Sequence, residues 1–145
     1  MPIAARVGAS ELQRIATESY VNQSFKVALV DAPGSTFDAD DPLATVIANE
    51  VTSGLGGYTR QQIGFTTADI GLYDEGSVPF ARKAATFVHN NQPAQSFRFS
   101  HVVLLSPDEQ NVVCTVKLAG RATLSDGQAA IFYFDFTLFG VFIAA

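Results

Sequence analysis

Short strand-like runs separated by turns dominate this sequence and constrain its fold more than any other feature. After Tyr20 the hydrophobic pattern takes a period of two over residues 25–30, and the turn-forming sequence Asp-Ala-Pro-Gly follows at residues 31–34. Further runs rich in β-branched and aromatic residues are predicted strands, at residues 58–65, 84–89, 97–106, 111–118 and 129–142. This succession predicts a mainly β fold, a β-sandwich or a jelly-roll-like pair of sheets.

One short helix is predicted, at about residues 10–20. Ser10 is placed to act as its N-cap, with Gln13 three residues later. The apolar side chains of the segment fall on one helical face: Leu12, Ile15, Ala16 and Tyr20. We therefore expect this helix to pack on the body of the protein.

Residues 38–57 allow two interpretations. The dipeptide Asp-Pro at residues 41–42 could begin a short helix that ends near Ile47, or the whole segment could cross the surface as a long loop. Three glycines close the segment and are expected to form a flexible bend before the next strand: Gly54, Gly56 and Gly57. The bend lacks the Lys-Ser or Lys-Thr and the following helix that a phosphate-binding loop requires.

The length of 145 residues is that of one domain large enough to bury a full hydrophobic core. We predict a single domain over residues 1–145, with an acidic loop and the glycine bend at about residues 31–57. No signal-peptide pattern opens the sequence, and its longest nearly apolar stretch, residues 136–145, is far shorter than the roughly 20 residues of a membrane-spanning helix. We therefore expect a soluble protein with no membrane partner.

The negative charge of the chain is concentrated in one segment. Nine Lys and Arg against 14 Asp and Glu give a net charge of −5. Residues 27–59 hold no basic residue, while their acidic residues are Asp31, Asp38, Asp40, Asp41 and Glu50. Because no basic cluster is present to neutralise phosphates, no nucleic-acid partner is expected.

The acidic residues Asp38, Asp40 and Asp41 invite comparison with a calcium site, since calcium prefers carboxylate oxygens. Counted from Asp38, the segment lacks the glycine at the sixth position and the glutamate at the twelfth that an EF-hand loop requires. The spacing favours a solvated acidic loop or a partner-facing patch. No metal and no other cofactor are predicted.

Patterns typical of catalytic sites are weak. Neither His89 nor His101 lies at the spacing of a zinc site, and both are expected to be satisfied structural histidines. Ser100 and His101 are adjacent on a predicted strand, which places their side chains on opposite faces, and no G-x-S-x-G elbow is present. The lone Cys114 is expected to be a buried structural thiol. We therefore predict no catalytic residue and no enzymatic activity.

Aromatic residues crowd the C-terminal end. Phe132, Phe134 and Phe136 share one face of a predicted strand, and Phe139 and Phe142 follow. A contiguous exposed apolar patch would be an aggregation site. Either this strand is central in the sandwich, or its end is covered by another subunit.

Several short motifs follow one another in a distinctive order. They are the helix near residue 10, the strand 25–30 with its Asp-Ala-Pro-Gly turn, Asn-Glu-Val-Thr-Ser-Gly at 49–54 running through Gly57 into Tyr-Thr-Arg-Gln at 58–61, the strand 99–104, Leu-Ala-Gly-Arg at 118–121 and Ser-Asp-Gly at 125–127. Over residues 9–138 this order resembles a family of small virion proteins of tailed bacteriophages. Members of that family are labelled tail fibre, decoration or structural proteins. The glycine bend followed by Tyr-x-Arg is the most distinctive of the shared motifs.

The resemblance implies a structural protein that is assembled in the host cytoplasm and localises to the virion. The chain departs from the family pattern at Thr59, where a small Ala is commoner, and by the acidic insertion at residues 38–41. The absence of sequence repeats and coiled-coil heptads favours a capsid decoration (cement) protein, with a tail-attached fibre component or adaptor as the alternative. The expected partner is the major capsid protein or a tail protein of the same virion. We also expect a homo-oligomer, with a trimer favoured.

The candidate interface combines the acidic segment with residues near the bend and the C-terminal end: Asp38, Asp40, Asp41, Glu50, Tyr58, Arg60, Phe139 and Phe142. Arg60 follows Tyr58 on one face of a strand that otherwise lacks charge, so we predict that it pairs with a carboxylate of its own domain or of a neighbour. A further alternative is a carbohydrate-binding β-sandwich, in which Tyr58, Tyr73 and the acidic loop form the ligand surface.

Overall fold

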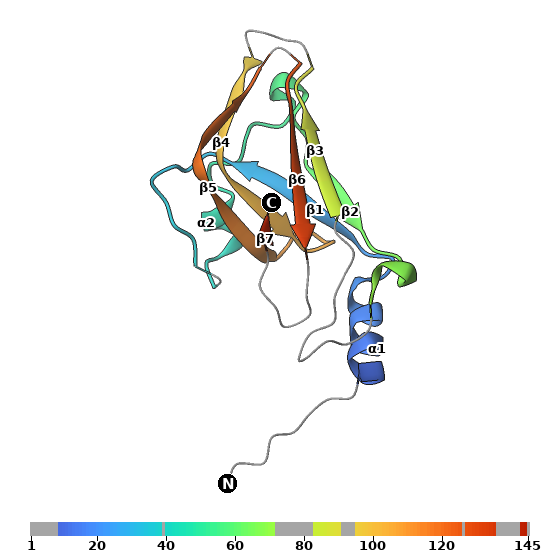
Figure 1. Cartoon of the computed structure of the whole chain (residues 1–145). Coiled ribbons are helices and arrows are strands. Elements are labelled where there is room, and N and C mark those ends of the chain that lie inside the picture. The colour runs from blue at the N-terminus through green and yellow to red at the C-terminus, as the bar shows by residue number, and fades with distance from the viewer. Residues whose placement is uncertain are drawn as a thin grey trace. The chain divides into compact units, whose positions relative to one another are not determined.

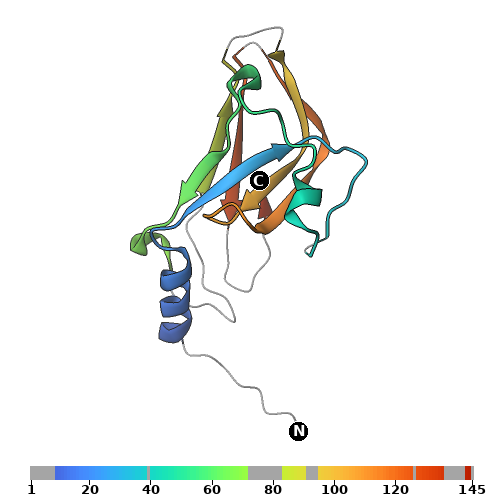
Figure 2. The same ribbon diagram turned by 180° about the vertical axis from the view of Figure 1, so that it is seen from behind.

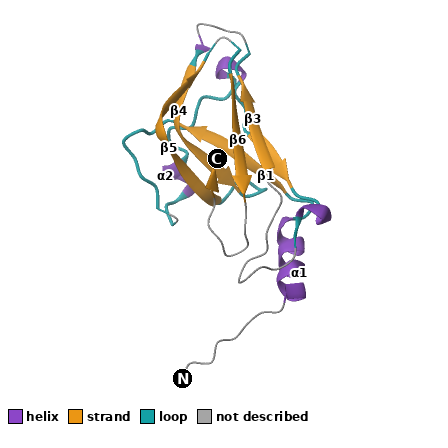
Figure 3. Ribbon diagram, in the orientation of Figure 1, coloured by secondary structure: helices purple, strands orange, loops and turns teal. Residues whose placement is uncertain are grey.

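The protein is mainly β, and its strands form two antiparallel sheets in a β-sandwich-like fold with one short N-terminal helix, as predicted. A computed structural model describes residues 9–38, 40–71, 83–90, 95–125, 127–135 and 143–144. Figure 1 labels the elements along the chain, and Figure 3 separates the strands, in orange, from the helical segments, in purple.

The four-stranded sheet has the order β2-β1-β4-β5, and the three-stranded sheet has the order β3-β6-β7. The strands are β1 (Ser24–Val30), β2 (Gln61–Gly64), β3 (Lys83–Val88), β4 (Phe97–Leu105), β5 (Val112–Leu124), β6 (Ala129–Asp135) and β7 (Ile143–Ala144). The helical segments are α1 (Ala9–Tyr20), α2 (Leu43–Val46) and the 3₁₀ turns η1 (Leu55–Gly57) and η2 (Thr67–Asp69). Within the described part of the chain, no helix has both the length and the apolar character needed to cross a membrane.

The chain divides into two compact units. The smaller comprises Met1–Gln23, Gly64–Lys83 and Tyr133–Ala145, and the larger comprises Ser24–Ile63 and Ala84–Phe132. In the smaller unit, α1 begins at Ala9, one residue before the predicted N-cap. Ser10 therefore lies inside the first helical turn, and the prediction that it is the N-cap is wrong.

Residues at the end of α1 pack against the segment that follows β2 in the smaller unit. Tyr20 meets the ring of Phe65 edge to face, with 6.1 Å between ring centroids. Lys83 Nζ lies 2.7 Å from Asp69 Oδ2 and 5.8 Å from the centroid of the Phe65 ring. Phe65 is buried as a result of these contacts.

In the larger unit, aromatic side chains fill the space between the two sheets. Phe87 of β3 contacts Phe132 of β6 edge to face at 6.2 Å between ring centroids, and Phe132 contacts Phe99 of β4 at 5.8 Å. Tyr58 stacks on Phe87 at 6.0 Å and meets Phe97 edge to face at 5.9 Å. This aromatic layer explains the alternation of buried and exposed residues along β3.

A second apolar cluster lies on the other face of the central strands, under α2. Val46 of α2 packs with Ala28 and Val30 of β1 and with Val103 and Leu105 of β4. In the view of Figure 2, β1 crosses in front of β6 and α2 lies to the right of it. Of the two interpretations of residues 38–57, the short helix is confirmed, and the segment closes the core instead of crossing the surface as a loop.

The pairing of β4 with β5 shifts register between Phe99 and His101, and this irregularity overturns one prediction. Phe99 contacts Phe132 between the sheets, whereas His101 packs on Phe37 on the opposite face, with 4.9 Å between ring centroids. Ser100 Oγ lies 2.8 Å from His101 Nδ1. The two adjacent side chains therefore lie together and not on opposite faces, because the irregular pairing breaks the strict alternation of a strand.

Several strand ends differ from the prediction. β5 continues to Leu124 because the register shift accommodates residues 118–121 within the strand. β2 begins only at Gln61, since Tyr58 belongs to the glycine bend. The described part of the last long predicted strand is β6, up to Asp135. Residues 136–142 of that prediction, which include the predicted interface residues Phe139 and Phe142, lie outside the described residues.

Hydrogen bonds connect the glycine bend to Asn90 and Gln95. The Gly56 N–H donates to Gln95 Oε1 at 3.1 Å, and the Asn90 N–H donates to the Gly56 carbonyl at 2.9 Å. His89 Nε2 lies 3.2 Å from the Gln95 carbonyl oxygen. Gly56 has a φ of 58°, a backbone conformation that favours glycine.

Candidate functional site

Residues 49–51 are fixed beside the end of β1 by backbone hydrogen bonds. The Val51 N–H donates to the Leu29 carbonyl at 3.0 Å, and the Asp31 N–H donates to the Asn49 carbonyl at 2.9 Å. Glu50 forms an isolated antiparallel bridge with Val30. The acidic segment is thereby anchored to the four-stranded sheet at the position of Glu50.

The Glu50 carboxylate is the centre of a hydrogen-bonded network. Arg60 donates to it twice, from Nε at 2.9 Å and from Nη2 at 2.7 Å, which is the bidentate geometry of strong Arg–carboxylate pairs. Arg60 Nη1 donates to Glu109 Oε1 at 3.0 Å. The prediction that Arg60 pairs with a carboxylate is therefore confirmed, and both partners belong to the same unit.

Tyr58 connects this network to the core. Its hydroxyl donates to Glu50 Oε2 at 2.8 Å and accepts the Leu29 N–H at 3.0 Å. The side chain is buried, with 3% of its surface exposed. Tyr58 therefore offers no ring to a partner or a sugar, and its predicted role in an interface or a carbohydrate surface is wrong.

The network sets the protonation of its members. Burial acts to raise the pKa of Glu50, but the hydrogen bonds from Arg60 and Tyr58 outweigh it and hold that pKa below its usual value. The hydrogen bond to Glu50 raises the pKa of Arg60. Burial raises the pKa of the Tyr58 hydroxyl. Glu50 and Arg60 are charged and Tyr58 is neutral at physiological pH, which is the state that makes all of these hydrogen bonds.

A second ion pair holds the start of the acidic segment. Arg121 of β5 donates from Nε to Asp31 Oδ1 at 2.9 Å, and its Nη2 also pairs with this carboxylate. The hydrogen bond from Arg121 lowers the pKa of Asp31. Next to this pair, the Ala32 N–H donates to Ser100 Oγ at 2.8 Å. The segment is thus held at Asp31 by an ion pair to β5, and at Glu50 by its backbone bridge to β1 and its ion pair with Arg60.

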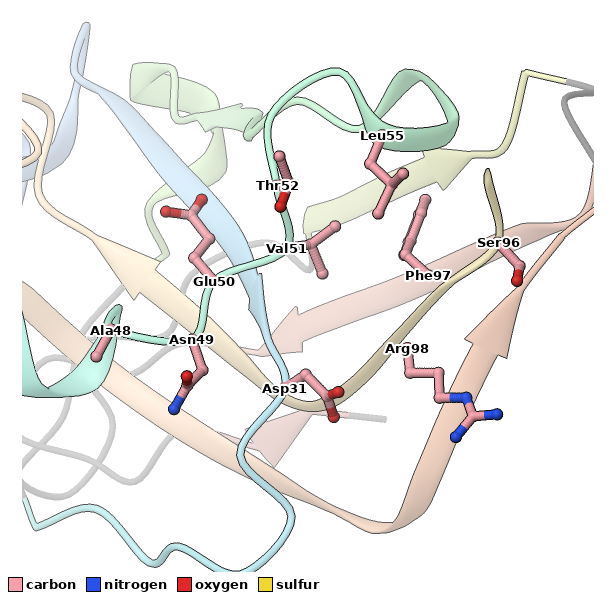
Figure 4. A pocket seen from close by; sticks show the side chains of 10 residues that line it. All are labelled: Asp31, Ala48, Asn49, Glu50, Val51, Thr52, Leu55, Ser96, Phe97 and Arg98. Atoms are coloured by element: carbon pink, nitrogen blue, oxygen red, sulfur yellow. The ribbon is translucent and has the colours of Figure 1, made fainter. Parts of the chain in front are cut away.

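A shallow, open pocket of about 460 Å³ lies between residues 48–55 and the start of β4 (Figure 4). The residues that line it are Asp31, Ala48, Asn49, Glu50, Val51, Thr52, Leu55, Ser96, Phe97 and Arg98. Figure 4 shows that Val51, Leu55 and Phe97 converge, whereas the Glu50 carboxylate points away from them. Carboxylate, amide, hydroxyl and guanidinium groups around a small apolar floor are suited to a polar ligand with several hydroxyl groups.

A second cavity, of about 370 Å³, shares Glu50 and Val51 with the first. Its lining includes Tyr58, Arg60 and Glu109. These polar groups are already hydrogen-bonded to one another. The chemistry of this cavity is therefore that of a structural brace.

Asp38, Asp40 and Asp41 lie on the loop before α2. Asp38 and Asp40 are exposed, and Asp41 Oδ2 accepts the Asp38 N–H at 2.7 Å. None of the three forms an ion pair with a described Lys or Arg residue, and the described residues contain no group of three acidic, His or Cys side chains placed to hold a metal ion. The structure brings these three candidate residues together on one loop, while Glu50, Tyr58 and Arg60 lie in the brace. Tyr73 lies outside the described residues.

Sequence reasoning missed Glu109, Asp31 and Arg121 as members of the site. Glu109 is 49 residues from Arg60, and Arg121 is 90 residues from Asp31, so neither pairing leaves a local pattern in the sequence. Arg98, on the rim of the larger cavity, was also missed. The sequence signal that could have pointed to Arg98 is a charged residue inside a mostly apolar predicted strand.

Neither histidine is exposed, and the lone cysteine is largely buried. His89 and His101 are each 1% exposed, but within the described part of the chain His101 Nε2 has no hydrogen-bond partner, so this histidine is not fully satisfied as predicted. Burial lowers the pKa of His101 and raises the pKa of the Cys114 thiol to about 12. His101 and Cys114 are therefore uncharged at neutral pH, which agrees with structural roles.

Comparison with known proteins leaves the chain without an assigned family. No protein-family model, no curated protein and no solved structure matches it.

Proposed function

We propose that this protein is a non-enzymatic structural component of a tailed-bacteriophage virion, and specifically a capsid decoration protein that docks on the particle through its acidic loop. The order of its motifs resembles that of small virion proteins of tailed bacteriophages, and this resemblance supports a role in the virion. The observation that supports docking most directly is that Asp38 and Asp40 are exposed on a segment held by two ion pairs, from Asp31 to Arg121 of β5 and from Glu50 to Arg60.

Charge is used in two different ways along this segment. The carboxylates of Asp31 and Glu50 are neutralised within the chain by Arg121 and Arg60. Those of Asp38 and Asp40 have no such partner among the described residues and are exposed to solvent. A loop presented in this way attracts a basic patch and loses little conformational entropy on binding.

Cryo-electron microscopy of the virion that encodes this chain tests the proposal. We expect density for the β-sandwich at regular positions on the capsid lattice. Quantitative mass spectrometry of purified particles provides the second measurement, since decoration implies hundreds of copies per particle. A capsid without this density, together with undetectable protein in purified particles, would rule out a virion role.

Quantitative mass spectrometry of purified particles also distinguishes a decoration protein from a tail-attached module. A tail fibre component or adaptor shares the sequence features of the chain but is present in far fewer copies. A count of a few to a few dozen copies per particle would replace the decoration protein with a tail-attached module.

The docking surface is tested by neutralising the loop. We expect the triple variant Asp38→Asn, Asp40→Asn, Asp41→Asn to bind particles at least about tenfold more weakly than the unaltered protein at low salt, with a smaller difference at high salt. The matched control is Asp108→Asn, which removes an exposed carboxylate from the turn between β4 and β5. Equal weakening by both variants would mean that net charge and not the loop governs docking.

A second candidate function is binding of a carbohydrate, and the cavity of Figure 4 favours it. Asp31, Asn49, Thr52 and Arg98 supply donors and acceptors around about 460 Å³ of space. A glycan array, repeated with the variant Arg98→Ala, tests this function. Binding that is lost in the variant supports it, and an array without any response removes it.

A further inference from the structure

Within the larger unit, β3 and β6 share an outer face of exposed, uncharged and mostly apolar residues. Residues that alternate with the buried Ala85 and Phe87 project outward from β3, and their counterparts project from β6: Ala84, Thr86, Val88, Ala129 and Ile131. All five are exposed, with 57% of the surface of Val88 and 49% of that of Ile131 in contact with solvent. We call these five residues the β3–β6 face. Figure 1 shows β3 and β6 side by side, on the side of the sandwich away from α2.

We propose that the β3–β6 face is a self-association surface, on which a second copy of this chain packs through the same face around a two-fold axis, so that the homo-oligomer is a dimer in place of the trimer expected from the sequence. Monomeric proteins expose large apolar side chains singly far more often than in neighbouring pairs on one sheet. Val88 and Ile131 lie on adjacent strands and are among the most exposed large apolar residues of the described chain. A contact through this face removes both from water.

The charge distribution of the chain favours a second copy as the partner on this face. A basic partner would be attracted to Asp38 and Asp40, because the β3–β6 face offers it no opposite charge. A second copy carries the same net charge of −5, so two copies repel each other wherever acidic surfaces meet. The β3–β6 face is a surface on which two copies can approach without placing like charges opposite each other.

The geometry of a sheet face also suits a two-fold contact. An isologous interface pairs a patch with itself, which requires a surface that is complementary to its own copy. Sheet faces meet this requirement because two of them pack with interdigitated side chains at an angle of about 30°. The short, β-branched side chains of Thr86, Val88 and Ile131 lose little rotamer entropy on packing. This inference rests only on the described strands and does not depend on the proposed function.

Sedimentation equilibrium and light scattering of the full chain test the proposal. Concentrations up to about 0.5 mM are needed, because a contact through only five residues of each copy is expected to be weak. We expect the average mass to rise from that of the 15.5 kDa chain toward twice that value. The double variant Val88→Lys, Ile131→Lys places like charges across the axis, and we expect it to raise the dissociation constant at least about tenfold. Thr86→Lys, at an exposed polar position that does not contribute to the core, should act in the same direction and guards against misfolding of the double variant.

The matched control is Val113→Lys, at an exposed apolar position of β5 in the other sheet. We expect this variant to self-associate like the unaltered chain. A chain that stays monomeric at every concentration, that forms a trimer, or whose association survives both Thr86→Lys and the double variant would overturn the proposal. A variant that loses virion binding but still self-associates, or the reverse, would show that self-association and the proposed function are independent of each other.

Discussion

Gly56 lies directly against the imidazole ring of His89: a β-carbon at position 56 would fall 2.5 Å from His89 Cδ2 and 2.9 Å from the carbonyl oxygen of Gln95. Both neighbours are themselves fixed, since His89 is buried and bonded to Gln95. The contact leaves room for a hydrogen atom only. It explains a glycine in the bend by close packing as well as by its positive φ.

Gly56→Ala should therefore destabilise the protein strongly. We expect a loss of at least about 2 kcal/mol in the free energy of unfolding, from steric overlap together with strain at a positive φ. Urea denaturation followed by circular dichroism measures it. Gly34→Ala is the control, because no atom lies within 4 Å of a β-carbon at that position, and its effect should stay within about 0.5 kcal/mol. Similar losses in the two variants would mean that the His89 contact is not the cause.

Tyr58→Phe removes one hydroxyl group from the core. The Leu29 N–H then loses its acceptor inside the protein, and Glu50 loses a donor, so we expect a loss of about 1–3 kcal/mol. Hydrogen exchange of the Leu29 amide gives a local readout, and its protection should fall more than that of the neighbouring amides of β1. Unchanged protection at Leu29 would contradict the assigned hydrogen bond.

Glu50→Gln tests the network that fixes the acidic segment. The amide keeps the shape of the side chain but loses the charge that Arg60 pairs with, and we expect a loss of about 1–3 kcal/mol. Glu109→Gln is the matched control, because Glu109 is more exposed and accepts a single bond from Arg60. We expect it to cost less than about 1 kcal/mol. A larger cost for Glu109→Gln than for Glu50→Gln would place the centre of the network elsewhere.

The same carboxylates predict the response to acid. Hydrogen bonds with Arg60 and Tyr58 outweigh burial and hold the pKa of Glu50 below its ordinary value of 4.5, and the hydrogen bond from Arg121 holds the pKa of Asp31 below 3.8. A carboxyl with a lowered pKa in the folded state contributes stability above its ordinary pKa, and this contribution is lost as the pH falls through the folded-state pKa. We therefore expect stability to fall below about pH 5. Urea denaturation of the Glu50→Gln variant between pH 7 and pH 3 should show a smaller fall than the unaltered chain, and identical slopes would count against the lowered pKa of Glu50.

Cys114 should be slow to react in the folded protein. Burial raises the pKa of its thiol from 9.0 to about 12, which reduces the thiolate fraction at pH 8 by roughly a thousandfold. The rate of reaction with Ellman's reagent should fall by a similar factor relative to the urea-unfolded chain. Rapid labelling of the folded protein would show that the thiol is exposed by local opening.

Local sequence patterns predicted the helix and the strands well, but they did not predict contacts between residues that are far apart in the sequence. The alternation over residues 25–30 and the periodicity near residues 10–20 correspond to β1 and α1, because both are properties of neighbouring residues. The pairing of Arg60 followed from an unusual charge on one strand face, but its partners did not, since Glu109 comes from a distant turn. Tyr58 looked like a surface aromatic in the sequence, and only the fold shows that it lies between the sheets.

The Ser100–His101 pair marks a different limit. Strict alternation is the only rule that a sequence offers for the faces of a strand, and it fails where β4 and β5 shift register. The same shift hides the true length of β5, because residues 118–121 contain a glycine and resemble a turn. Irregular pairing is a property of two strands together and has no signature in either one alone.

The register shifts of β5 also affect how readily another chain can add a strand at this edge of the sheet. β5 is the edge strand of the four-stranded sheet, and its ladder with β4 is broken between Leu104 and Leu105 and again between Phe99 and His101. A foreign strand that adds to an edge needs an unbroken row of backbone donors and acceptors, and here the regular stretches are residues 114–117, which include the charged Lys117, and residues 122–124. Growth of intermolecular sheets from this edge is therefore discouraged at its first step. An added strand could pair with β5 only over short stretches of this edge.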